Sequence, residues 1–166
     1  HFALTNLLLP YVTDRVVTVS SSAHRMGRIV IDDLNWERRR YRAWAAYGQS
    51  KLANLLFTLE LTRRLTAAGS PVRAYAAHPG YAATELQAVG PQMENSTIGK
   101  LLMSASNALL AQPAAMGALP TLYAATAPDV RSGEFFGPDG RWQIRGNPVS
   151  CPVRPHARDP GVASRC

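Results

Sequence analysis

The sequence predicts an α/β fold in which the strands of a parallel sheet alternate with helices. Two short runs of β-branched and small apolar residues, residues 15–20 and 72–77, are typical of buried strands. Between them, residues 44–68 repeat apolar side chains at helical spacing, and no proline interrupts the run. A strand, a long helix and a second strand in this order indicate a βαβ unit, which places its two strands parallel in one sheet.

The amino-terminal part is predicted to hold a helix, a strand and a long connection. Residues 1–9 are mostly apolar and favour the end of a helix, which Pro10 stops. Residues 15–20 are almost continuously apolar, which indicates a strand that is buried on both faces. Residues 24–42 are polar and rich in arginine without a clear period, so we expect loop and short helix there.

The central helix has the strongest pattern in the chain. Leucines recur through residues 44–68 at helical spacing, and leucine is a good helix former. Gly69 follows the last turn and Pro71 lies just beyond it, which is a common signal for the end of a helix. We therefore expect one uninterrupted helix of about seven turns.

The carboxyl-terminal half is predicted to add two helices and a short strand. Residues 97–110 and 114–126 favour helices, with Pro120 as a candidate kink in the second. Residues 134–136 are typical of a last strand, and residues 137–140, Gly-Pro-Asp-Gly, of a turn.

The last segment differs in composition from the rest of the chain. Residues 148–166 alternate proline with arginine and contain few large apolar side chains. Such segments bury too little apolar surface to offset the loss of chain entropy on folding. We therefore predict one domain over residues 1–147 and a disordered tail over residues 148–166.

Composition argues against several classes of protein. The net charge is +7, but the arginines are scattered apart from one cluster, Arg38-Arg39-Arg40 with Arg42. A solvated loop accounts for that cluster, so we expect no nucleic-acid binding. No apolar run approaches the ~20 residues that a membrane span needs, and we expect a cytoplasmic protein. The two cysteines, Cys151 and Cys166, have no metal-ligand or redox spacing, so we expect neither a metal site nor a disulfide framework.

Tyr47 and Lys51 form a chemically meaningful pair at the start of the central helix. Because they are four residues apart, they lie one turn apart on the same helix face. A nearby ammonium favours the ionised form of a phenol, and such a tyrosine can donate and accept a proton near neutral pH. A surface tyrosine beside a solvated lysine has the same spacing, so the pair alone leaves both interpretations open.

Two strand ends bring further polar residues to one edge of the predicted sheet. The first strand ends at Ser20, Ser21 and Ser22, and the second ends at residues 78–80, His-Pro-Gly. Ligands of parallel sheets bind outside the carboxyl ends of the strands, and the helix that begins at Tyr47 crosses between these two strands. A serine hydroxyl at this edge could bond a substrate oxygen while the tyrosine moves its proton.

Four segments occur in a distinctive order along the chain. They are Val16-Val17-Thr18-Val19-Ser20-Ser21, Tyr47-x-x-x-Lys51, His78-Pro79-Gly80 with Thr84, and Phe136-Gly137-Pro138. Together they resemble the short-chain dehydrogenase/reductase family, and VSSSAH, AYGQSKLANLLFTLEL and HPGYAATEL are similar to its retinol-dehydrogenase-like branch. The resemblance implies a doubly wound, Rossmann-like parallel sheet. It also implies an NAD(P)-dependent oxidoreductase that acts on a lipophilic alcohol, aldehyde or ketone.

The resemblance implies catalytic roles for three residues. Ser21 would orient and polarise the substrate carbonyl or hydroxyl, with Ser20 and Ser22 as adjacent alternatives. Tyr47 would be the general acid/base. Lys51 would favour the ionised form of that tyrosine and hydrogen-bond the nicotinamide ribose.

The resemblance also implies contacts with a cofactor and a small-molecule substrate. The cofactor would be NAD or NADP, with the preference left open. Besides Tyr47 and Lys51, the residues expected to bind it are Pro79, Gly80 and Thr84. The candidates to face the substrate are His24, Met26 and Tyr81, with residues 86–110 as a lid. For His24 and Met26, ordinary packing is the alternative.

The chain departs from the family pattern where the cofactor pyrophosphate would bind. The glycine-rich turn T-G-x-x-x-G-x-G, which holds the pyrophosphate at a helix N-terminus, is absent from these 166 residues. The sequence therefore predicts the carboxyl-terminal part of the fold, with its first βαβ units missing. We expect the chain alone to bind NAD(P) weakly and to associate, with the helix of residues 44–68 as the candidate surface of a homo-oligomer. The alternative is a non-catalytic remnant or interaction module.

Overall fold

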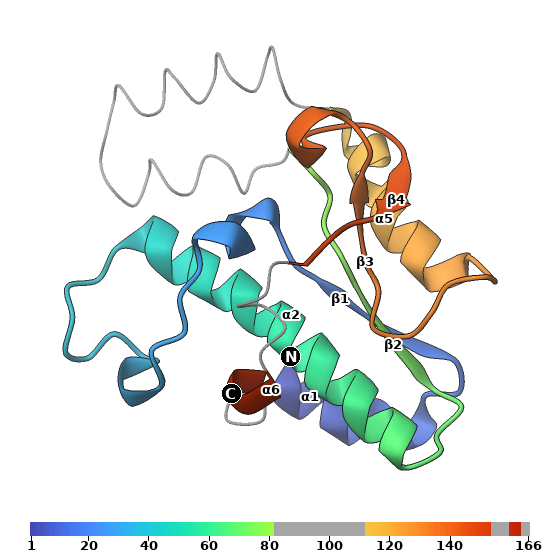
Figure 1. The fold of residues 1–166 in the computed structure, drawn as a ribbon, viewed down its shortest axis with the longest axis horizontal. Coiled ribbons are helices and arrows are strands. Elements are labelled where there is room, and N and C mark those ends of the chain that lie inside the picture. The colour runs from blue at the N-terminus through green and yellow to red at the C-terminus, as the bar shows by residue number, and fades with distance from the viewer. Residues whose placement is uncertain (82–111, 154–159, 164–166) are drawn as a thin grey trace.

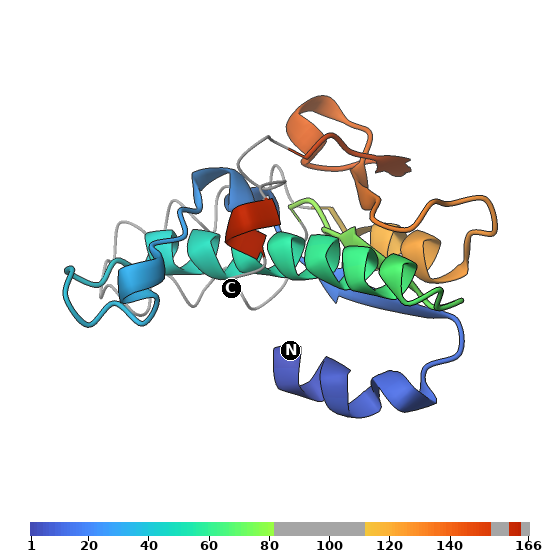
Figure 2. The same cartoon turned by 60° about the horizontal axis from the view of Figure 1, so that its bottom comes forward.

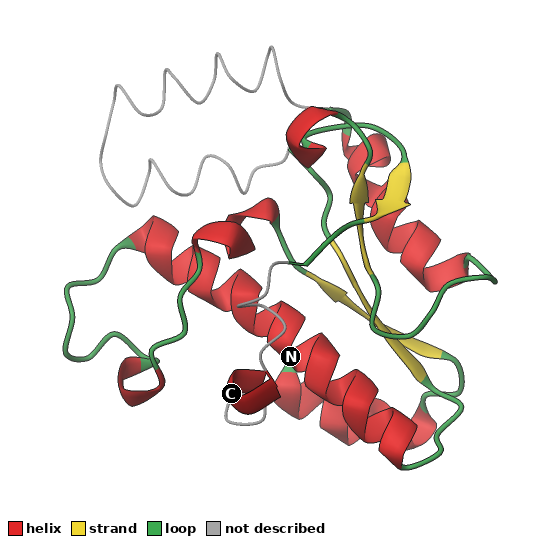
Figure 3. Ribbon diagram, in the orientation of Figure 1, coloured by secondary structure: helices red, strands yellow, loops and turns green. Residues whose placement is uncertain are grey.

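The protein is an α/β structure with one four-stranded sheet and helices on both of its faces (Figures 1 and 3). The computed structural model describes residues 1–81, 112–153 and 160–163. In the order of the sheet, the strands are β1 (Arg15–Val19), β2 (Arg73–Ala77), β3 (Phe135–Pro138) and β4 (Pro148–Ser150). The first three are parallel and β4 is antiparallel to β3, so the predicted α/β fold with a parallel sheet is confirmed.

The long helix α2 (Ala43–Ala67) makes the crossover from β1 to β2 and covers one face of the sheet. Its leucine-rich face lies on the sheet, where Leu52, Leu55 and Leu56 share a core cluster with Phe135. The predicted helix over residues 44–68 is confirmed. Among the residues that the structure describes, no helix is both long and apolar enough to cross a membrane.

The carboxyl end of α2 stops where the glycine pattern predicts. Gly69 has φ +61°, a left-handed conformation that suits glycine. Its amide donates to the Thr66 carbonyl at 3.1 Å, and the Ser70 amide donates to the Leu65 carbonyl at 2.9 Å. These two bonds satisfy the last carbonyls of the helix and turn the chain toward β2.

The helix α5 (Ala114–Thr126) covers the opposite face of the sheet. Side chains of a strand alternate between its faces, so Tyr75 and Phe136 pack with Ala124 of α5 in a second core cluster. Pro120 lies inside α5, and the helix continues through it, as predicted for residues 114–126. The helix predicted over residues 97–110 lies outside the described residues.

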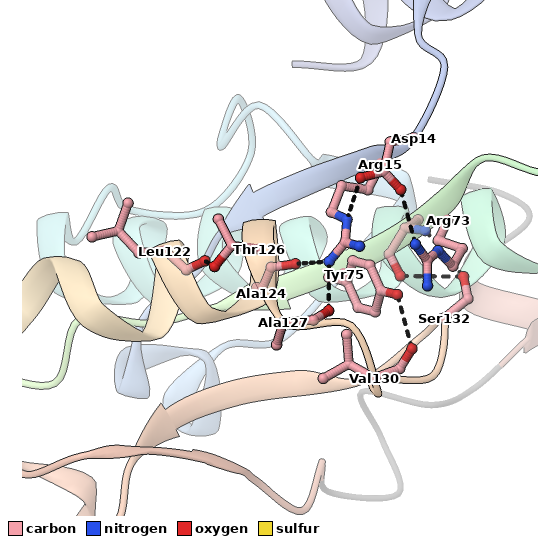
Figure 4. Close-up of polar contacts among 11 residues, drawn as sticks. Asp14, Arg15, Arg73, Tyr75, Leu122, Ala124, Thr126, Ala127, Val130 and Ser132 are labelled. Atoms are coloured by element: carbon pink, nitrogen blue, oxygen red, sulfur yellow. Dashed lines mark hydrogen bonds and ion pairs between the residues drawn. The ribbon is translucent and has the colours of Figure 1, made fainter.

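Arg15 of β1 fixes the carboxyl end of α5 to the sheet (Figure 4). Its Nη1 donates to the carbonyls of Ala124 at 3.1 Å and Ala127 at 3.0 Å, and its Nε to the Asp14 carboxylate at 2.9 Å. The guanidinium also lies 5.4 Å from the centre of the Tyr75 ring. A cation at this end of a helix meets the negative pole of the helix dipole, so the contact stabilises α5 in place.

The amino-terminal helix lies beside the carboxyl-terminal half of α2 (Figures 1 and 2). α1 (Phe2–Leu8) continues into the short 3-10 helix η1 (Leu9–Tyr11), which agrees with the helix predicted for residues 1–9. The rings of Phe2 and Phe57 meet edge to face, with centroids 6.2 Å apart.

The prediction that β1 is buried on both faces is confirmed only in part. Val16 and Val17 pack against core clusters on opposite faces of the sheet, but most of the strand is only partly buried. Within the described sheet, β1 has one neighbour, β2, and Thr18 is the one fully buried residue of the strand. Val19 is exposed. The run of β-branched residues favours the extended conformation of a strand. How deeply the strand is buried depends instead on its place at the edge of the described sheet.

The prediction of a disordered tail over residues 148–166 is wrong for the parts that the structure describes there. β4 pairs with β3, and the Cys151 amide donates to the Phe135 carbonyl at 2.7 Å. The short helix α6 (Pro160–Ala163) packs against α2, where Cys151 and Ala163 join the core cluster of Leu55. Small apolar side chains are enough to hold this segment in place, because they pack on an apolar surface that α2 and the sheet already provide.

The predicted turn over residues 137–140 begins later than expected. Gly137 and Pro138 belong to β3, because β4 returns alongside and pairs with both of them. The connection between these strands holds the short 3-10 helix η4 (Arg141–Gln143).

Candidate active site

The carboxyl ends of β1, β2 and β3 meet at one edge of the sheet. The Ser20 amide donates to the Ala77 carbonyl at 2.7 Å, and the His78 amide donates to the Phe136 carbonyl at 2.8 Å. Each bond continues the ladder one residue beyond the strands. The chain segments that follow, carrying the predicted site residues, therefore leave the sheet side by side.

The 3-10 helix η2 (Ser22–Met26) follows β1 and packs against the first turns of α2. Two glycines make this contact close. A Cβ atom at Gly27 would overlap the Gly48 carbonyl, and one at Gly48 would lie 3.0 Å from the Ala23 carbonyl oxygen. The backbone after Ser21 is thus in direct contact with the residue that follows Tyr47.

Tyr47 lies half-buried between two side chains of its own helix. The Trp44 ring meets the Tyr47 ring edge to face, with centroids 6.1 Å apart. The Lys51 Nζ atom lies 5.6 Å from the centre of the Tyr47 ring. The predicted arrangement of Tyr47 and Lys51 on one helix face is therefore present.

The Lys51 ammonium lies at the end of β1. Its Nζ donates to the Val19 carbonyl at 3.5 Å, and Asn54 Nδ2 donates to the same carbonyl at 2.9 Å. Burial lowers the pKa of Lys51 from its usual 10.5. A half-buried ammonium interacts more strongly with a neighbouring phenol than a fully hydrated one does.

The serines after β1 differ in how their hydroxyl groups are used. Ser20 is buried, and its Oγ donates to the Lys51 carbonyl of α2 at 2.8 Å. Ser21 Oγ accepts a bond from the Ala23 amide at 3.2 Å and so caps η2. Within the described part of the chain, the Ser20 proton is used to hold α2, whereas the Ser21 bond leaves its O–H proton for another acceptor.

The turn after β2 is fixed by its backbone. Gly80 has φ +69°, and a Cβ atom there would overlap the Ile144 carbonyl. The Gln112 side chain donates to the Pro79 carbonyl at 2.7 Å, and the Tyr81 amide donates to the Ile144 carbonyl at 2.6 Å. The structure thus presents Pro79 and Gly80 at the same edge as Ser21. Thr84 and the predicted lid, residues 86–110, lie outside the described residues.

The three candidates to face the substrate differ in exposure. His24 is 1% exposed and packs on Phe135, so the packing alternative describes it. Met26, at the end of η2, is 65% exposed. Tyr81 is half-buried, and burial raises the pKa of its phenol.

Sequence reasoning missed three residues of this edge. Trp44 and Asn54 lie three positions from Tyr47 and Lys51, a spacing that places them on the same helix face and could have identified them. Gln112 had no such signal. It is buried, and it holds Pro79 through Nε2 while its Oε1 accepts from the Gly146 amide at 3.2 Å.

Comparison with known proteins identifies the family. No protein-family model matches the chain. Human retinol dehydrogenase 13 is 41% identical over 175 residues, which cover 99% of this chain and 48% of that protein. Retinol dehydrogenase 12 from Mus musculus is 41% identical over 142 residues (82% and 42%), and polyprenol dehydrogenase from Mus musculus is 47% identical over 94 residues (52% and 28%). The chain belongs to the short-chain dehydrogenase/reductase family.

Within this family, the chain falls in the retinol-dehydrogenase-like branch, as its motifs predict. A crystal structure of an uncharacterized protein from Mycobacterium paratuberculosis is 50% identical and superposes with a TM-score of 0.75, covering 99% of this chain and 52% of that one. The four-stranded sheet with its helices therefore corresponds to part of a Rossmann-like fold. The chain spans about half the length of the curated relatives that it matches.

Proposed function

We propose that the complete protein, as its gene encodes it, interconverts an alcohol and its carbonyl compound with NAD or NADP as cofactor. The observation that carries this proposal is the meeting of the Ser21 segment with Tyr47 and Lys51 at one strand edge, in a chain 41% identical to a retinol dehydrogenase. The names of its relatives, retinol and polyprenol dehydrogenases, support a lipophilic substrate.

The residues at this edge fit a nicotinamide dinucleotide. Among the described residues, the Lys51 ammonium donates one hydrogen bond, to Val19 at 3.5 Å, so its other N–H groups can donate to ribose hydroxyls. Tyr47 would share this contact, and the rigid turn at Pro79 and Gly80 would line the nicotinamide. When bound, the cofactor would supply or accept the hydride.

The side chains of the protein would carry out the proton transfer. In the reducing direction, the Ser21 hydroxyl would donate a hydrogen bond to the substrate carbonyl oxygen, and the Tyr47 phenol would transfer its proton to that oxygen. In the oxidising direction, the phenolate would remove the proton of the alcohol. The Lys51 ammonium would stabilise the phenolate, and its partial burial strengthens that interaction.

Replacement of Tyr47 by phenylalanine tests the proposal. The complete protein would be assayed with NADH and NADPH on retinal and a series of long-chain aldehydes. Tyr47→Phe removes the proton donor but keeps the ring, so we expect kcat to fall by at least ~10²-fold. Tyr11→Phe is the matched control, because Tyr11 is 81% exposed and lies in η1, before the start of β1, whereas the site lies beyond its carboxyl end.

Two results would count against this function. Undiminished turnover in Tyr47→Phe would remove Tyr47 from the reaction. A folded complete protein that binds neither cofactor and converts no substrate of the series would favour a non-catalytic remnant or interaction module.

A further inference from the structure

Two buried histidines pack against one phenyl ring next to the candidate active site. His24 and His78 are 1% and 0% exposed, and Phe135 is 2% exposed. The ring centroids of His24 and Phe135 are 5.4 Å apart, and those of His78 and Phe135 are 5.1 Å apart. The three residues come from η2, the position just after β2 and the start of β3. This three-ring cluster of His24, His78 and Phe135 therefore joins the three segments that meet at the site.

Each histidine also holds one backbone group of a predicted site residue. His24 Nδ1 lies 2.7 Å from the carbonyl oxygen of Ser21, the predicted catalytic serine. His78 Nδ1 accepts a bond at 3.2 Å from the amide of Gly80, a predicted cofactor contact. The three-ring cluster is thus connected directly to the backbone at Ser21 and at Gly80.

These bonds assign opposite tautomers to the two rings. A carbonyl oxygen can only accept, so His24 must carry its proton on Nδ1 to bond Ser21. An amide N–H can only donate, so His78 Nδ1 must be without a proton to bond Gly80. The neutral His78 ring therefore carries its proton on Nε2.

The surroundings of His78 keep it neutral at neutral pH. Burial, the largest cause, lowers its pKa to about 4; the Gln143 side chain acts in the opposite direction, and His24 and Arg25 lower it further. Protonation of His78 would add a hydrogen to Nδ1, which would then face the Gly80 N–H and could no longer accept its hydrogen bond. The ring fits because Gly137 has no side chain: a Cβ atom there would overlap His78 Nε2.

We propose that His24 and His78 are positioning residues, which use opposite tautomers to fix the backbone at Ser21 and at Gly80. This inference rests on the proposed function of the site. In this proposal, His24 positions the backbone of Ser21 and does not itself contact the substrate. The aromatic ring of Phe135 couples the two halves, because neither imidazole can shift without disturbing its packing against that ring.

Nitrogen NMR of the imidazole rings tests the tautomers without an activity assay. In long-range ¹H–¹⁵N spectra of the chain at pH 7, we expect one buried ring protonated on Nδ1 and the other on Nε2. Spectra of His24→Asn and His78→Asn assign the two. The same tautomer on both rings, or a charged His78 ring, would overturn the proposal.

Kinetics of the complete protein test whether His24 acts through Ser21. His24→Phe keeps a ring and loses the donor, so we expect kcat to fall about tenfold, the loss of one hydrogen bond, with little change in KM. His24→Asn keeps an N–H donor close to the position of Nδ1 and should retain most of the activity. In a Ser21→Ala background, His24→Phe should lower kcat no further. An equal fall in both backgrounds would show a general loss of structure and overturn the role.

Cofactor binding tests the role of His78. His78→Phe should weaken binding of NADH or NADPH, measured by fluorescence titration, about tenfold, because the Gly80 amide loses its acceptor. Unchanged cofactor affinity in a folded His78→Phe variant would overturn the role of His78. An inactive wild type would instead overturn the proposed function, and the NMR tautomers would still report on both backbone contacts.

Discussion

At the edge of the sheet, neighbouring serines are used for different purposes. Ser20 donates its proton to the Lys51 carbonyl and so holds the first turns of α2 against β1. Ser21 accepts a bond from the Ala23 amide, which caps η2. Substitution of the two serines is therefore expected to affect different properties, activity for Ser21 and stability for Ser20.

Ser21→Ala should lower kcat of the complete protein, whereas Ser20→Ala should mainly lower its stability. The first change removes the group proposed to polarise the substrate oxygen. The second removes the hydrogen bond that ties the end of β1 to α2, at a cost of about 1 kcal/mol in the free energy of unfolding. Steady-state kinetics and urea unfolding of both variants separate the effects. If Ser20→Ala loses activity while Ser21→Ala keeps it, the catalytic serine is the other one.

His78 should make the protein less stable as the pH falls from 6.5 to 4. Burial lowers its pKa from 6.5 to about 4 in the folded state, so in this window the unfolded chain binds a proton that the folded chain does not. The free energy of unfolding should fall by at most ~3 kcal/mol across the window, since one pKa unit corresponds to ~1.4 kcal/mol. Urea unfolding at several pH values measures the slope.

His78→Gln should flatten that dependence, because the variant has no titrating group at this position. His1→Gln, at the exposed amino terminus, is the matched control and should leave the slope unchanged. A slope that survives in His78→Gln would assign it to other groups.

At the scale of elements, the approach of η2 to α2 depends on two glycines. The prediction of loop and short helix over residues 24–42 is confirmed by η2 and by the 3-10 helix η3 (Ile31–Asp33). The sequence contains Gly27 and Gly48 as isolated glycines without a motif. Only the structure shows why glycine is required at both positions, because the backbone of η2 contacts the backbone of α2 there.

Gly27→Ala should lower activity, because its Cβ would displace η2, and with it Ser21, from α2. Overpacking of this kind costs about 1–3 kcal/mol in the free energy of unfolding. Gly69→Ala is the matched control: it strains a left-handed residue at the far end of α2, where no atom lies within 4 Å of a new Cβ. We expect both variants to lose stability in urea and only Gly27→Ala to lose kcat. Equal kcat in the two would mean that the contact does not position Ser21.

At the scale of the whole molecule, the end of the chain contributes to the core. Shortening the chain to residues 1–147 should lower the urea midpoint, because it removes β4, α6 and the Cys151 side chain that cover Leu55 and Phe135. The matched comparison is the 166-residue chain under the same conditions. Equal midpoints would restore the prediction of an unpacked tail.

The family and the fold class were predictable from the sequence because their signals extend along the whole chain. The expected homo-oligomer through residues 44–68 and the cytoplasmic location stay predictions. The roles assigned to Ser21, Tyr47 and Lys51 likewise await the kinetic tests.

The sequence by itself determined the elements and their order. Leucine spacing defines α2, Gly69 ends it, and β-branched residues mark β1, because these signals act between residues a few positions apart. Only the tertiary structure decided that Ser20 holds α2, that His24 and His78 share Phe135, and that Cys151 enters the core. These outcomes depend on contacts between segments far apart in the chain, and local spacing carries no information about which of them come together.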